Sequence, residues 1–151
     1  MNTALKIDFV SDVSCPWCAI GLAALEQALS RIADEATAEL HFQPFELNPR
    51  MPPGGQDITE HLTEKYGSTP AQQAAAREAI RQRGAALGFM FNEAGRDRIY
   101  NTFDAHRLLH WAGLPDTRPA GLQPALKRAL ISGGQPVEVF EQTLRQILRG
   151  D

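Results

Sequence analysis

The stretch that decides the fold is Val10-Ser11-Asp12-Val13-Ser14-Cys15-Pro16-Trp17-Cys18, which holds both cysteines of the chain. Before it, residues 5–10 alternate apolar and polar side chains and predict a strand that ends in a short polar loop. After it, apolar side chains recur at helical spacings of three and four, at Cys18, Leu22, Leu25, Leu29 and Ile32. Pro16 suits the first turn of that helix. The two cysteines are therefore expected where a strand gives way to a helix.

A second strand is predicted over residues 40–47, with Leu40 and Phe42 on one face. Pro44 interrupts its alternation, so this strand should lie at a sheet edge or carry a bulge. A strand, a helix and a strand in the first 50 residues predict a right-handed βαβ unit with parallel strands.

Beyond the Pro- and Gly-rich loop that begins at Asn48, helical signals dominate. Starting signals at Asp57 and at Thr69 predict helices that end near Gly67 and Gly88, and a third helix is predicted over residues 101–112. A connector over 114–124, a short helix over 125–130 and a closing helix from Pro136 complete the prediction. We expect three parts: a βαβ unit over residues 1–50, a helical insert over 51–130, and a C-terminal piece of the first domain over 131–151.

Composition excludes several classes of protein. The 151 residues are 43% hydrophobic and 22% charged, with a formal net charge of −3. The apolar fraction predicts a folded chain. No stretch is long and apolar enough for a membrane span. The Lys and Arg residues are too scattered along the sequence to predict a nucleic-acid-binding surface. No signal peptide is visible at the N-terminus, so a cytoplasmic location is expected.

The cysteine pair predicts redox chemistry. At the start of a helix, backbone N–H groups and the positive end of the helix dipole favour a thiolate, which is the form that attacks disulfides. Cys15 is therefore the expected nucleophile. Cys18, one turn later and at the head of the buried stripe, is the expected resolving thiol, shielded while Cys15 faces outward.

Two other interpretations of the pair stay open. A zinc site could combine Cys15 and Cys18 with His106 and His110, although the 87 residues between Cys18 and His106 far exceed the spacing of compact zinc motifs. Two buried structural thiols are the second alternative, and chance seldom places the only two cysteines of a chain at one helix start. We expect no metal.

Three motifs in order resemble the DsbA-like oxidoreductases of the FrnE group. They are residues 9–18, Phe45-Glu46-Leu47-Asn48-Pro49, and residues 101–108, with Ser132-Gly133-Gly134-Gln135 similar to the start of the closing helix. The resemblance implies a thioredoxin-like α/β fold with an inserted all-α domain, and thiol–disulfide oxidoreductase activity. Since no export signal is visible, a reductase or isomerase role is expected. We expect the side chains of Pro16, Trp17, Asn48, Asn101 and His106 to line the substrate site, and the resemblance favours this role for Asn101 and His106.

Related hydroxychromene-carboxylate isomerases and kappa-class glutathione transferases share this architecture but usually carry Ser at the position of Cys15. A glutathione-dependent isomerase or transferase is therefore the alternative enzyme. A protein or small-molecule thiol or disulfide is the expected substrate. No cofactor is expected beyond the redox-active disulfide. Whether glutathione is a co-substrate and whether the protein forms a homodimer are left open by the sequence.

The chain departs from the family near its end. A thioredoxin sheet closes with a hairpin that follows a cis-proline loop, and residues 127–134 run from Lys127 to Gly134 without such a loop. We therefore expect the C-terminal hairpin and the cis-proline loop to be missing from this sequence.

Three further side chains are predicted from their local pattern alone. Asp12 is expected as an exposed loop carboxylate, His61 as a surface residue of its helix, and Trp111 as a core residue.

Overall fold

The computed structural model describes residues 3–91, 97–114 and 145. The predicted connector, the short helix, the closing helix and the expected loss of the hairpin and cis-proline loop all fall on positions outside these residues.

Two parallel strands with a helix between them form the centre of the molecule. Strand β1 (Thr3–Ser11) leads into helix α1 (Pro16–Arg31), which returns the chain to strand β2 (Ala36–Pro44). The strands pair in parallel over nine positions, from Thr3 opposite Ala36 to Ser11 opposite Pro44. The predicted βαβ unit is thus confirmed. Pro44 closes the pairing, where its missing N–H interrupts no ladder.

The core lies between α1 and one face of this sheet. Its fully buried members are mainly on α1, with Ala24, Leu25, Ala28 and Ile32 at 0–2% exposure. Side chains from the sheet pack against them, including Leu5, Ile7, Phe9 and Leu40. The predicted stripe on α1 is confirmed at Leu22, Leu25 and Ile32, and Leu29 is half-buried.

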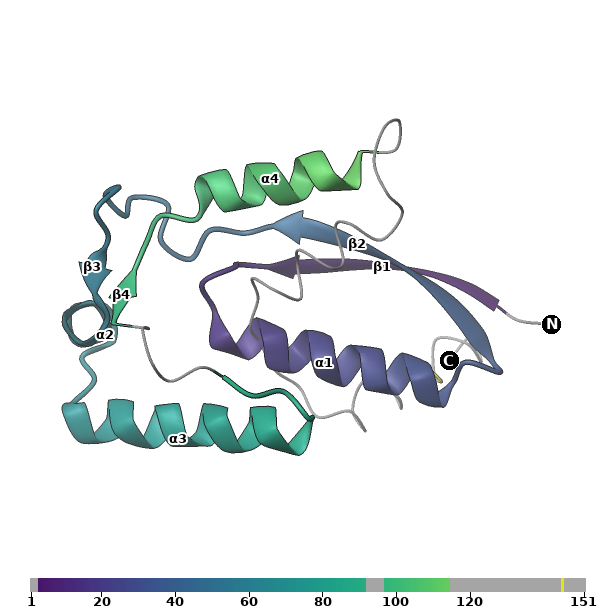
Figure 1. Ribbon diagram of the computed structural model, residues 1–151, viewed down its shortest axis with the longest axis horizontal. Helices are drawn as coiled ribbons and strands as arrows, with labels where there is room; N and C mark the ends of the chain where they lie inside the picture. Colours follow the sequence, from purple (N-terminus) through teal and green to yellow (C-terminus); the bar gives the residue numbers. More distant parts are fainter. Residues whose placement is uncertain (1–2, 92–96, 115–144, 146–151) are drawn as a thin grey trace.

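Helix α4 (Phe103–Gly113) lies on the opposite side of the two strands from α1 (Figure 1). Leu109 and Ala112 are buried on its inner face, whereas Leu108 and Trp111 are 46% and 48% exposed. The prediction that Trp111 belongs to the core is therefore wrong. Leu109 and Ala112 lie three residues apart and therefore on one face of α4, which packs on the sheet. Trp111 lies on another face of the helix and stays half exposed.

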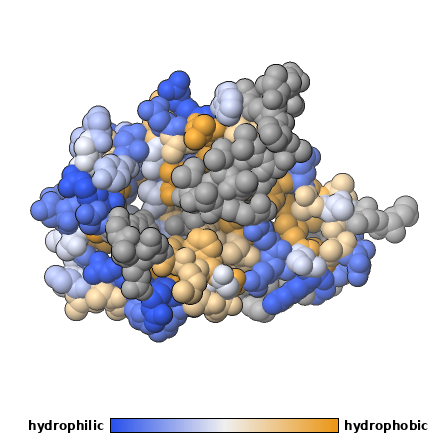
Figure 2. All heavy atoms as spheres, in the orientation of Figure 1, coloured by the Kyte–Doolittle hydropathy of each residue, from blue (hydrophilic) through white to orange (hydrophobic). Residues whose placement is uncertain are grey.

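Helices α2 (Ile58–Tyr66) and α3 (Pro70–Ala86) follow the loop after β2. The Asp57 side chain caps α2, Gly67 ends it in the left-handed conformation at φ 65°, and Thr69 and Gln72 form a capping box on α3. Hydrophilic side chains cover the end of the molecule where α2 lies (Figure 2). The predicted starts and the predicted end of α2 are confirmed because each is encoded by a local hydrogen bond.

Two short strands were not predicted. β3 (Gln56–Asp57) pairs antiparallel with β4 (Arg98–Ile99), immediately before α2 and shortly before α4. The pair joins the segment that precedes α2 to the segment that precedes α4. In the described residues no helix is long and apolar enough to cross a membrane.

Candidate functional site

Cys15 and Cys18 stand at the start of α1, beside the ends of both central strands. Cys15 is the N-cap residue, Pro16 opens the first turn, and the Cys18 amide donates to the Cys15 carbonyl oxygen at 3.0 Å. The two cysteines are not joined by a disulfide bond in this structure. Both have intermediate exposure, so the expected contrast between a shielded Cys18 and an outward Cys15 is not seen.

Both cysteines line one small cavity of about 270 Å³. Its walls come from the end of β1, the start of α1 and the loop after β2, and the other lining residues are Val10, Ser11, Asp12, Phe45 and Leu47. We call this space the thiol cavity. Apart from Ser11 and Asp12, the side chains around the two sulfur atoms are apolar.

Asp12 is the most deeply buried carboxylate of the site, at 1% exposure. Its Oδ1 accepts from the Ser14 amide at 3.2 Å, and its Oδ2 accepts from the Leu47 amide at 2.6 Å. The prediction of an exposed loop carboxylate is wrong. The side chain turns inward because two backbone donors of neighbouring loops compensate its desolvation.

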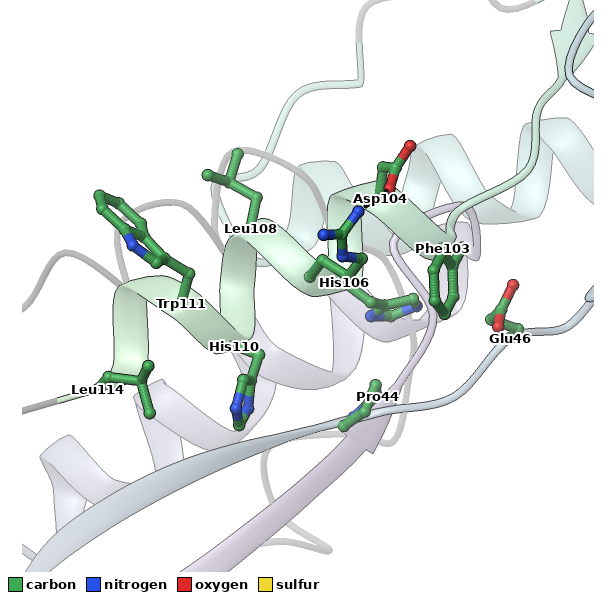
Figure 3. A pocket seen from close by; sticks show the side chains of 10 residues that line it. Pro44, Glu46, Phe103, Asp104, His106, Leu108, His110, Trp111 and Leu114 are labelled. Atoms are coloured by element: carbon green, nitrogen blue, oxygen red, sulfur yellow. Dashed lines mark hydrogen bonds and ion pairs between the residues drawn. The ribbon is translucent and has the colours of Figure 1, made fainter.

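His106 reaches Asp12 from the far side of the sheet. Its Nε2 lies 3.3 Å from Asp12 Oδ1, and its side chain is 6% exposed. The same ring lines a second, larger cavity of about 930 Å³ between α4 and the end of β2. Figure 3 shows Phe103 and His110 on the side of α4 that faces Pro44. The Asp12–His106 contact thus links the walls of the two cavities.

Asn48 and Asn101 hold the loop after β2 in place. The Asn48 Oδ1 accepts from Lys65 Nζ at 2.6 Å, and the Asn101 Nδ2 donates to the Met51 carbonyl oxygen at 3.3 Å. Within the described part of the chain, neither residue lines the thiol cavity or the larger cavity. Trp17 is 38% exposed and also lies outside both linings.

The structure thus brings together only some of the residues predicted for the site. Cys15 and Cys18 share the thiol cavity, Pro16 sits between them in sequence, and His106 joins them through Asp12. Ser11, Phe45 and Leu47 were missed as cavity residues. The end of one strand and the loop after its neighbour meet at the same sheet edge, which is the signal that could have found them.

The described residues contain no group of three or more His, Cys, Asp or Glu side chains that could hold a metal ion. Cys15, Cys18, His106 and His110 therefore do not converge on one point, contrary to the zinc alternative.

The sequence model of the DSBA-like thioredoxin domain matches residues 6–149. This chain belongs to that family. No curated protein matches the chain significantly. Among solved structures, the fold is similar to that of a probable DsbA oxidoreductase from Streptomyces coelicolor, with a TM-score of 0.73 and 24% identity. That match covers 97% of this chain and 90% of the other.

Family membership and the structural likeness confirm the predicted thioredoxin-like fold. They also support the DsbA-like part of the resemblance. The FrnE subgroup within the DSBA-like family stays a prediction.

Proposed function

We propose that this protein is a thiol–disulfide oxidoreductase that uses Cys15 and Cys18 as a dithiol/disulfide couple. The observation that carries the proposal is the shared cavity: both cysteines of the chain line one small apolar space at the start of α1. Membership in the DSBA-like thioredoxin domain family supports the same chemistry.

Cys15 is the nucleophile in this proposal because it occupies the N-cap position. The amide groups of a first helical turn and the helix dipole both favour a negative charge at this point. The Cys15 thiolate attacks one sulfur of a substrate disulfide. The substrate S–S bond breaks, a mixed disulfide forms with Cys15, and one substrate thiolate leaves.

Cys18 completes the exchange. Its thiolate attacks the Cys15 sulfur, the mixed disulfide breaks, and the second substrate thiolate leaves. Two electrons pass from the protein dithiol to the substrate, and the protein keeps a Cys15–Cys18 disulfide. The reverse sequence oxidises a substrate dithiol. A protein or small-molecule disulfide is the proposed substrate, since the exchange requires only an accessible sulfur.

The test compares the two single cysteine variants in reduction of insulin disulfides with dithiothreitol as the electron donor. Cys15→Ser should fall to the uncatalysed rate. Cys18→Ser should retain the first attack and accumulate a mixed disulfide, seen by intact mass and released by excess reductant. Because the chain has only these two cysteines, each variant is the control for the other. A wild-type rate in Cys15→Ser would contradict the proposal, and glutathione-dependent turnover in that variant would favour the isomerase or transferase instead.

A further inference from the structure

The Asp12 carboxylate binds three segments that are distant in sequence. It accepts from the Ser14 amide in the loop before Cys15, from the Leu47 amide in the loop after β2, and it contacts His106 on α4. These three contacts are made by the two carboxylate oxygen atoms of Asp12, and the residue is 1% exposed. A buried carboxylate held in this way fixes the relative positions of its partners, since losing any one of them leaves charge uncompensated.

Two of these segments form the wall of the thiol cavity. Ser14 immediately precedes Cys15, and Leu47 lines the cavity together with the two cysteines. Leu47 is held from its other side as well, because its carbonyl oxygen accepts from Lys65 Nζ at 2.8 Å. The Asp12 carboxylate therefore holds the segment before Cys15 next to the loop after β2, and the Lys65 hydrogen bond fixes that loop in turn.

His106 is the third point of attachment and the only one that comes from a side chain. It is 6% exposed, and 94 positions in sequence separate it from Asp12. A carboxylate only accepts hydrogen bonds, so Nε2 of His106 carries the proton that faces Asp12. Through this contact, α4 restrains the loop that precedes the nucleophile.

We propose that Asp12 and His106 are positioning residues of the Cys15–Cys18 couple. Asp12 sets the geometry of the loop from which Cys15 projects, and His106 fixes Asp12 from α4. This role rests on the proposed function, because it concerns the cysteine couple. The contacts of Asp12 with Ser14, Leu47 and His106 do not depend on that function.

The oxidised and reduced forms of the couple differ at Cys15, which directly follows the loop that Asp12 holds through the Ser14 amide. A contact that is stronger in one form stabilises that form by its difference in free energy between the two. Loss of the His106 tether should therefore change the equilibrium constant of the exchange between protein dithiol plus glutathione disulfide and protein disulfide plus two reduced glutathione molecules.

The decisive comparison is His106→Leu against His106→Gln. Both side chains fill much of the space of the imidazole, but only Gln keeps an N–H donor for Asp12. Neither change alters the charge of Asp12. Asp8→Asn is the matched control, because Asp8 is an exposed carboxylate on β1, four residues before Asp12, and its partner is the side chain of Gln43.

Two quantities are measured on folded full-length chains: the equilibrium constant with glutathione, and hydrogen exchange of the Ser14 and Leu47 amides. We expect His106→Leu to change the equilibrium constant at least threefold and to speed exchange of both amides at least tenfold. His106→Gln and Asp8→Asn should stay within twofold of the wild type in both.

Equal behaviour of the Leu and Gln variants would overturn the proposal, since packing alone would then explain His106. An unchanged equilibrium constant in His106→Leu would overturn it too. Should His106→Leu fail to fold, Asp12→Asn replaces it: an amide keeps one acceptor oxygen, and loss of protection at Leu47 or Ser14 with a shifted equilibrium is again expected. These readouts need no turnover, so they are separate from the loss of activity in Cys15→Ser that tests the proposed function.

Discussion

The ring of Phe9 meets the ring of Phe42 edge to face, with centroids 6.0 Å apart and planes inclined at 77°. The two residues are direct partners in the parallel pairing of β1 with β2. Phe42 is 8% exposed and Phe9 packs against the buried residues of α1. This pair therefore couples the register of the sheet to its packing on α1.

Truncation of Phe42 should be among the most destabilising changes in the described part of the chain. Phe42→Ala is expected to lower the free energy of unfolding by about 3–5 kcal/mol, because a buried ring is lost and a cavity is left. A double-mutant cycle with Phe9→Ala should give a coupling of about 0.5–1.5 kcal/mol. Urea unfolding measures both, and Tyr66→Ala, on a 62% exposed ring, is the control. A coupling near zero would contradict the edge-to-face contact.

The βαβ unit and the starts of α2 and α3 can be predicted from the sequence because their signals are local. Alternation in residues 5–10, the apolar stripe of α1 and the capping side chains of α2 and α3 each depend on neighbours within a few positions. β3 and β4 were missed because two residues are too few to show a period. Their pairing depends on a contact between residues more than 40 positions apart.

Gln73 on α3 shows what local patterns cannot reveal. It is 2% exposed, and its Nε2 lies within 3.0–3.2 Å of four oxygen atoms of Thr59, Thr63 and Ser68. An amide among Ala residues of a helix looks like a surface residue until α2 is packed beside it. The burial of Asp12 has the same origin, since Leu47 and His106 arrive from distant segments.

Replacement of Gln73 should loosen the junction of α2 and α3. Gln73→Leu removes the buried N–H donor that these four oxygen atoms share and is expected to cost about 1–3 kcal/mol of unfolding free energy. Gln73→Glu should cost more, because it places a further acceptor among those oxygens. Gln82→Leu, on the exposed part of the same helix, should change stability by less than about 0.5 kcal/mol. Thermal unfolding compares the three variants, and a Gln73→Glu chain as stable as the wild type would contradict the hydrogen-bond assignment.

Gly84 in α3 is required by close packing. An added Cβ would lie 2.7 Å from the Phe89 carbonyl oxygen and 2.8 Å from the Phe91 ring. Ala favours a helix by roughly 1 kcal/mol over Gly, but overpacking costs about 1–3 kcal/mol. Gly84→Ala is therefore expected to destabilise the protein in urea unfolding. Gly54→Ala is the control, since its Cβ would meet nothing within 4 Å. A stability gain in Gly84→Ala would show that the two aromatic residues move away freely.

His61 should give the folded protein a dependence on pH. Burial lowers the pKa of His61 below its ordinary value of 6.5, and the nearby charge of Lys65 lowers it further. At 8% exposure this residue is buried, so the prediction of a surface histidine is wrong. The unfolded chain then binds a proton at His61 more readily than the folded chain does, and the contribution of this residue to stability is lost as pH falls below 6.5. Urea unfolding between pH 7.5 and about 5 should therefore show a smaller loss of stability in His61→Gln than in the wild type. His110→Gln, at an exposed position on α4, should keep the wild-type slope, and an unchanged slope in His61→Gln would mean that other groups cause the dependence.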